Sequence, residues 1–290
     1  MPTTTTLLPT PHATISLTDT GPPSSPPSPP SPAILLLHSN SLSSKIFLPL
    51  LPSLSSTHRT LTLDLPGHGS SSDATIPSTS YTMSGYAEVA LDVLEGLGVK
   101  EVVVVGWSLG GHVGVEMLEQ QQRGREKVKI VGLVIVGTPP ARGAGEIRRG
   151  FRFSGEEVPM AGRRGLGGEG EGEFVRGTVG SGWEGWMEGD VRRADGRARE
   201  VMWESFAGGK GADQRRVVEE EKEVLVGVIN GADEPFVNLD YLDAIQWGNL
   251  WRGECIRIEG AKHAPHWEKR EEFEKLLQEF LADVEKIGQQ

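Results

Sequence analysis

The chain has 290 residues, enough for one α/β domain of ordinary size or two small ones. Its formal net charge of -11 argues against nucleic acid or an anionic membrane surface as a partner. No apolar run approaches the roughly 20 residues that a membrane span needs. The first residues lack the basic start and the apolar segment of a secretory signal, so we expect a cytoplasmic protein.

Strands and helices are expected to alternate along the first hundred residues. Residues 12–20 alternate weakly between apolar and polar, which predicts an edge strand. The proline- and serine-rich segment 21–32 is interpreted as a stiff hairpin loop between two strands. The continuous apolar run 33–37 is typical of a strand buried on both faces. Further elements are a helix over 46–54 that prolines interrupt, a strand over 59–64 and a helix over 86–97.

The most informative stretch follows, at 101–118. A run of four valines, 102–105, indicates a buried strand, and the residues from Gly111 onward indicate a helix. Between them lies Gly106-Trp107-Ser108-Leu109-Gly110, a G-x-S-x-G pattern. A strand, this pattern and a helix are the context of a nucleophile elbow, where the serine holds a strained backbone angle and the glycines let strand and helix approach. The alternative is an ordinary strand-to-helix turn that carries a serine.

The second half continues the alternation around one long interruption. Residues 141–222 mix acidic and basic residues and are glycine-rich around 162–172; we expect a loop there, then helices near 192–206 and 213–223. This segment is interpreted as a small helical cap inserted after the sixth strand, the alternative being a plain surface insertion. The remaining elements are strands over 128–136, 224–229 and 254–258 and an amphipathic helix over 273–284. The whole predicts a single α/β domain, 1–290, with a mostly parallel sheet flanked by helices.

Polar residues cluster where the predicted strands end, which is where parallel sheets bind ligands. They include Ser108, then the pair Asp233-Glu234, then His263, and a serine, acid, histidine order is that of an α/β-hydrolase triad. The chain therefore resembles the α/β-hydrolase superfamily, a large group of esterases, lactonases and carbon–carbon bond hydrolases. Four stretches carry the resemblance: 37–40, 64–70, 106–111 and 260–268.

The resemblance implies a role for each of these residues. Ser108 would be the nucleophile and His263 its base, with His266 as the competing histidine. The acid that orients the histidine stays open between two neighbours: the family register, counted from Gly231, points to Glu234, but loop geometry could favour Asp233.

The oxyanion hole needs two backbone N–H groups. Leu109 would supply one and Asn40 the other, although Ser39 stands where similar proteins usually have glycine. Pocket residues are expected to be Ser39, Trp107, Phe236 and Trp267, whereas His38, His68 and His112 are expected to make local hydrogen bonds.

We interpret the chain as a serine hydrolase that cleaves a small ester, lactone or related carbonyl compound through an acyl-enzyme. Hydrolytic carbon–carbon cleavage is chemically adjacent. No metal and no cofactor is expected, because the chain has neither a His-x-x-x-His pattern nor a dinucleotide loop. A small-molecule receptor on a hydrolase scaffold is the alternative. The sequence does not indicate the substrate or the oligomeric state.

Overall fold

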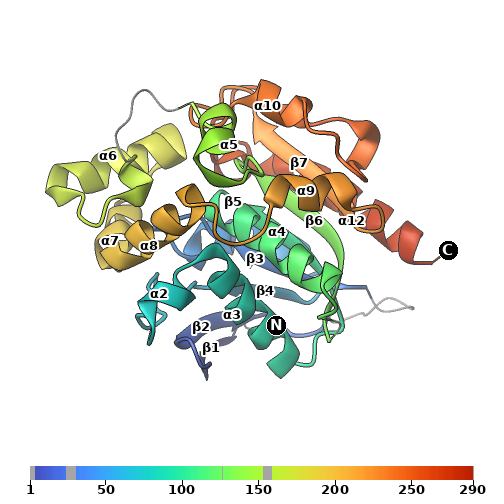
Figure 1. The fold of residues 1–290 in the computed structure, drawn as a ribbon. Helices are drawn as coiled ribbons and strands as arrows, with labels where there is room; N and C mark the ends of the chain where they lie inside the picture. Colours follow the sequence, from blue (N-terminus) through green and yellow to red (C-terminus); the bar gives the residue numbers. More distant parts are fainter. Residues whose placement is uncertain (1–3, 24–30, 126, 153–158, 290) are drawn as a thin grey trace.

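The computed structural model describes residues 4–23, 31–125, 127–152 and 159–289 (Figure 1). Within these ranges, eight strands form one sheet in the order β1-β2-β4-β3-β5-β6-β7-β8. β1 and β2 pair antiparallel, as do β2 and β4, and every other neighbouring pair is parallel. The predicted α/β fold with a mostly parallel sheet is confirmed. The strands are β1 (Thr4–Pro9), β2 (Thr14–Asp19), β3 (Ala33–Leu37), β4 (Thr60–Leu63), β5 (Glu101–Trp107), β6 (Lys129–Val136), β7 (Leu225–Gly231) and β8 (Ile256–Ile258).

The first strand was not expected, and it corrects the prediction for residues 12–20. Those residues contain β2, but β1 covers its outer side, so β2 is an inner strand. β1 contains three threonines and no alternating pattern, which is why the sequence did not indicate it. The loop 21–32 does not close a hairpin, because β4 lies between β2 and β3; residues 24–30 of this loop fall outside the described residues.

Apolar residues cover both faces of the central strands, as the run 33–37 predicted. Leu35 and Leu37 of β3 belong to one buried cluster, and Ile34 and Leu36 belong to the other. Successive side chains of a strand point to opposite faces, so a strand between two helical layers is apolar throughout. α3 (Met83–Gly96) and α4 (Leu109–Gln122) cover the first face. The second is covered by α12 (Arg270–Gly288), by α1 (Leu51–Leu54) and by the 3₁₀ helix η1 (Ser44–Leu50), in which Pro49 lies.

Residues 141–222 are more helical than the sequence indicated. From Gly167 onward the glycine-rich part is not a loop but lies in α6 (Gly167–Val179), where the buried side chains of Val175 and Val179 belong to the second cluster. That packing offsets the poor helix propensity of glycine. α6, α7 and α8 lie together at one side of the molecule (Figure 1), whereas α9 packs on α4. The helices are α5 (Gly143–Gly150), η2 (Met160–Gly162), α6 (Gly167–Val179), η3 (Gly180–Gly182), α7 (Gly185–Arg193), α8 (Gly196–Ala207) and α9 (Gln214–Glu220).

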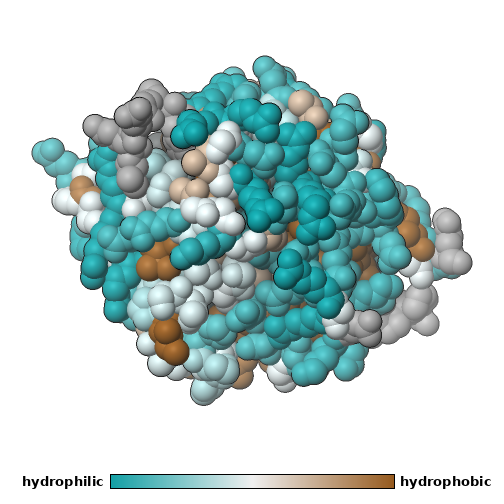
Figure 2. Space-filling model, in the orientation of Figure 1, coloured by the Kyte–Doolittle hydropathy of each residue, from teal (hydrophilic) through white to brown (hydrophobic). Residues whose placement is uncertain are grey.

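Short helices complete the chain: α2 (Pro77–Ser80), α10 (Leu239–Asp243), η4 (Trp251–Gly253) and α11 (Pro265–Glu268). The surface seen in Figure 2 is mostly hydrophilic, with small scattered apolar spots. Among the helices of the described ranges, none has both the length and the apolar character to cross a membrane.

Candidate active site

The turn between β5 and α4 holds Ser108 in a strained conformation. Its φ is 54° and its ψ is −113°, a combination that side chains with a Cβ rarely adopt. Two glycines make the turn possible. A Cβ atom on Gly106 would lie 2.2 Å from the carbonyl oxygen of Gly110, and one on Gly110 would lie 2.1 Å from that of Leu37. The strand and the helix therefore approach more closely than any larger residue allows, as the elbow pattern predicted.

The structure brings His263 and Glu234 together from two different loops. Glu234 follows β7 and His263 follows β8, and the Nδ1 atom of His263 lies 2.8 Å from Oε2 of Glu234. Both side chains are buried, with 0% and 5% exposure for the glutamate and the histidine. The other carboxylate oxygen accepts the backbone N–H of Phe236 at 2.9 Å. Asp233 is exposed, so the geometry favours Glu234 as the partner of the histidine.

The His263 ring is also fixed from its other sides. The indole N–H of Trp107 donates to the carbonyl oxygen of His263 at 2.7 Å. Gly137, with a φ of 60°, packs against the ring so closely that a Cβ atom there would lie 2.5 Å from Cε1. The ring of Phe236 meets it edge-on, with centroids 5.1 Å apart. Because Nδ1 donates to the carboxylate, Nε2 is left as the basic nitrogen.

Among the described residues, the competing histidine, His266, has no such partner. His266 is 2% exposed, and its ring lies 4.7 Å from that of Trp107 and 5.2 Å from that of Phe47. Burial, and then the charge of the nearby His263, lower the pKa of His266 to about 3. An imidazole that resists protonation in this way is a poor general base at neutral pH.

Three histidines, His38, His68 and His112, were expected to make local hydrogen bonds; His38 and His68 do so, whereas His112 bonds to a residue far along the chain. His38 donates to the carbonyl oxygen of Ser39 at 2.7 Å and accepts the N–H of Leu65 at 2.9 Å. His68 lies 3.0 Å from the carbonyl oxygen of Pro66. His112 lies 2.7 Å from the side-chain oxygen of Gln214. Burial lowers the pKa of all three.

The loop after β3 faces Ser108. Ser39 and Asn40 both line the cavity that Ser108 and Leu109 line, and the Asn40 side chain donates to the carbonyl oxygen of Ala161 at 2.7 Å. The left-handed residue of this loop is Ser41, with a φ of 63°. Serine in place of glycine at position 39 therefore introduces no left-handed strain.

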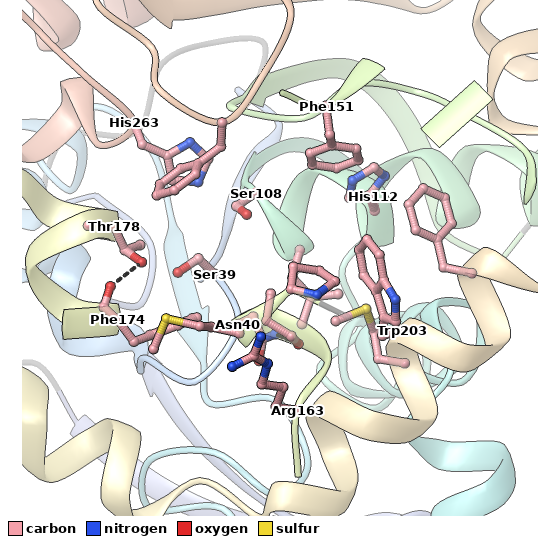
Figure 3. Close-up of a pocket in the computed structure, with 18 of the residues that line it drawn as sticks. Ser39, Asn40, Ser108, His112, Phe151, Arg163, Phe174, Thr178, Trp203 and His263 are labelled. Atoms are coloured by element: carbon pink, nitrogen blue, oxygen red, sulfur yellow. Dashed lines mark hydrogen bonds between the residues drawn. The ribbon is translucent and has the colours of Figure 1, made fainter. Parts of the chain in front are cut away.

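A cavity of about 500 Å³ opens over the serine. Figure 3 shows Ser108 and His263 on its wall, with Phe174 and Thr178 of α6 on one side and His112 and Trp203 on the other. Most of the apolar wall comes from segment 141–222, and its larger members are Phe151, Met160, Phe174, Met202, Trp203 and Phe206.

Of the four pocket residues expected from the sequence, the structure places two at this cavity and two elsewhere. Ser39 and Phe236 line this cavity. Trp107 does not, because its ring is buried beneath His263 (1% exposed), and Trp267 lies beside a different hollow, where its indole N–H donates to Gly182. The residues of α6 and α8 were missed, although the predicted helix over 192–206 contained Trp203. Within the described ranges, no group of three or more His, Cys, Asp or Glu side chains could hold a metal ion.

Comparisons with known proteins show the family and the fold of the chain. The sequence model of the alpha/beta hydrolase family matches residues 34–276. A solved structure of a mutant of the N-acyl homoserine lactonase AidH, complexed with N-hexanoyl homoserine, is 37% identical in sequence. It superposes with a TM-score of 0.89 and covers 98% of both chains. A complex of AidH with N-butanoyl homoserine gives 37% identity and a TM-score of 0.87, over 98% of this chain and 97% of that one.

Two further similarities are weaker. The esterase RhEst1 from Rhodococcus sp. ECU1013 has a TM-score of 0.71 at 20% identity, over 98% of this chain and 100% of its own, and shows likeness of fold alone. The pimeloyl-[acyl-carrier protein] methyl ester esterase of Aromatoleum aromaticum is 32% identical over 109 residues. The match spans only 38% of the length of that relative and 38% of this chain.

Proposed function

Since the chain belongs to the alpha/beta hydrolase family, we propose that it is a serine hydrolase that opens a small lactone, or cleaves a related ester, through an acyl-enzyme. One observation carries the proposal. The 2.8 Å hydrogen bond between Glu234 and His263 lies at the wall of the cavity that Ser108 lines. A buried carboxylate bonded to Nδ1 is what a histidine needs to act as a base toward a serine.

In this mechanism Ser108 Oγ attacks the carbonyl carbon of the substrate and His263 Nε2 takes the hydroxyl proton. Glu234 stabilises the imidazolium that forms. The negative oxygen of the tetrahedral intermediate accepts hydrogen bonds from the backbone N–H groups of Leu109 and Asn40.

When the intermediate collapses, the bond between the attacked carbon and the leaving oxygen of the ester or lactone breaks. His263 gives its proton to that oxygen. In a lactone that oxygen stays attached to the acyl group, so an acyl-enzyme with a free hydroxyl results. Water then attacks the acyl carbon, and His263 takes a proton from the water. The product acid leaves and Ser108 regains its proton.

The substrate class is proposed from similarity and from the cavity. The two AidH complexes contain N-acyl homoserines with four- and six-carbon acyl groups, which supports an N-acyl homoserine lactone as the substrate. A cavity of about 500 Å³ with a mainly apolar wall has room for a molecule of that size. Segment 141–222 supplies Phe174 and Trp203 to its wall, which supports a role as a cap over the site.

The test is turnover of N-butanoyl and N-hexanoyl homoserine lactone and of a short phenyl ester by the purified protein. Ring opening adds one water, so mass spectrometry detects it directly. We expect hydrolysis by the unaltered chain and a loss of at least about 10³-fold in kcat for Ser108→Ala. Equal rates in the two proteins would contradict the proposal. A folded protein that binds the lactone in calorimetry without turnover would instead support the receptor alternative.

A further inference from the structure

His112 lies in the cavity wall one helical turn beyond the proposed nucleophile. It is the fourth residue after Ser108 and lies in the first turn of α4, which begins at Leu109. The side chain is 4% exposed, and its ring contacts those of Phe206 and Phe151 at centroid distances of 4.9 and 6.1 Å. Figure 3 shows the ring on the same side of the cavity as Trp203. A polar ring therefore stands among aromatic side chains.

A buried network fixes which nitrogen of this ring carries the proton. Gln214 is 1% exposed, and its amide nitrogen lies 3.3 Å from Oε1 of Glu116 and 3.5 Å from the carbonyl oxygen of His112. Both of these atoms are acceptors, so the amide oxygen must face the imidazole. That oxygen lies 2.7 Å from Nδ1, which therefore donates to it. Glu116 is held in turn by the N–H of Ala212, at 3.0 and 3.1 Å from its two oxygens.

The other nitrogen of His112 is consequently a fixed acceptor. Burial lowers the pKa of His112 to about 4, so the ring is uncharged at neutral pH and has one donor and one acceptor. The donor is used by Gln214. Within the described part of the chain Nε2 has no hydrogen-bond partner, and the residue lines the cavity. An acceptor in an apolar wall favours a ligand that brings an N–H or O–H to it, because an unpaired polar atom is costly to cover.

We propose that His112 determines substrate specificity: its Nε2 accepts a hydrogen bond from an N–H on the carbon next to the attacked carbonyl. The chain would then prefer α-acylamino lactones and esters to analogues without that donor. The inference rests on the proposed function, because it takes Ser108 as the attacking atom.

A substrate of this kind can contact both residues, because both line one cavity. The attacked carbon lies about 3 Å from the serine oxygen before reaction. A nitrogen on the neighbouring carbon is two bonds further away. Ser108 and His112 line the same cavity, and the proposal places this nitrogen against Nε2 of His112.

A thermodynamic cycle between substrate and protein tests the proposal. The substrates are N-hexanoyl homoserine lactone and its carba analogue, in which CH₂ replaces the N–H group. The proteins are the unaltered chain, His112→Phe, Gln214→Leu as a positioning variant, and His68→Phe as a control. His68 is also buried, and it is not among the residues that line the cavity.

We expect the unaltered chain to prefer the N–H substrate by about tenfold in kcat/KM, the effect of one neutral hydrogen bond left unmade. His112→Phe should lower this ratio to about one by slowing the N–H substrate alone, Gln214→Leu should lower it in part, and His68→Phe should leave it unchanged. An unchanged ratio in His112→Phe, with the carba analogue turned over normally, would overturn the inference.

Two measurements distinguish a failure of the inference about His112 from a failure of the proposed function. If the unaltered chain opens neither lactone, the proposed function has failed; calorimetry with both ligands then decides the inference, and equal affinities would contradict it. In nitrogen-15 NMR of the resting protein at pH 7, we expect the Nδ1–H tautomer for the signal that disappears in His112→Phe. An Nε2–H tautomer or an imidazolium would also overturn the proposal.

Discussion

Two histidines face the same cavity, and both are held through Nδ1, yet their partners differ. His263 is bonded to the carboxylate of Glu234, whereas His112 is bonded to the amide oxygen of Gln214. A carboxylate stabilises the positive charge that a base acquires, and a neutral amide does so far less. Burial can then lower the pKa of His112 to about 4. The group bonded to Nδ1, rather than the residue type, therefore separates a base from a fixed acceptor.

The largest effect should come from giving His263 an amide partner like the one that His112 has. Glu234→Gln leaves an amide beside His263, and we expect kcat to fall by about 10³- to 10⁴-fold because the imidazolium loses its counter-charge and the tautomer is no longer fixed. Lactone ring-opening rates measure this. Asp233→Asn, on the exposed neighbour, is the matched control and should change kcat less than about threefold. Equal losses in the two variants would contradict the assignment of the acid.

A smaller loss should follow from moving the His263 ring without changing its partner. Gly137→Ala places a methyl group 2.5 Å from Cε1 of His263 and forces a left-handed φ on alanine. We expect kcat to fall by about 10- to 100-fold, since a displacement near 1 Å is enough to disturb proton transfer. Gly145→Ala is the control, because a Cβ atom there would meet nothing within 4 Å. Unchanged kcat in a folded Gly137→Ala protein would show that the ring tolerates the shift.

His266 extends the comparison to a histidine with neither ring nitrogen hydrogen-bonded among the described residues. Its pKa is about 3 in the folded chain and 6.5 in the unfolded one, so its contribution to stability is complete above pH 6.5 and is lost as the pH falls toward 3. His266→Phe removes this loss. We compare the free energy of unfolding of His266→Phe with that of the unaltered chain at two pH values. The difference should be about 2 kcal/mol more in favour of the variant at pH 5 than at pH 7.5. Urea titrations at both pH values measure it, and a pH-independent difference would contradict the burial argument.

The sequence indicated the central strands and the elbow, because local chemistry determines both, but it did not indicate β1. The valines 102–105 specify a strand buried on two faces, and only glycine fits at positions 106 and 110. The sequence could not decide whether Asp233 or Glu234 is the partner of the histidine. Adjacent residues after β7 point in different directions, and only the folded turn determines which one is buried. The helix in the glycine-rich part of 162–172 could not be predicted from the sequence either, because buried residues further along α6 stabilise it.

The pocket was predictable only in outline. Trp107 was expected in the pocket, but its side chain is buried under His263 and donates to the carbonyl oxygen of that residue. The role of Gln214 could not be predicted from the sequence, because Gln214 and His112, which are hydrogen-bonded, lie far apart in the chain.

The most direct test of the account is labelling with a serine-reactive fluorophosphonate, with the adduct located by mass spectrometry. We expect one adduct, on Ser108, in the unaltered chain, none in Ser108→Ala, and labelling at least about 10²-fold slower in His263→Ala. A folded protein that forms no adduct, or reacts equally fast in His263→Ala, would contradict the claim that His263 and Glu234 activate this serine.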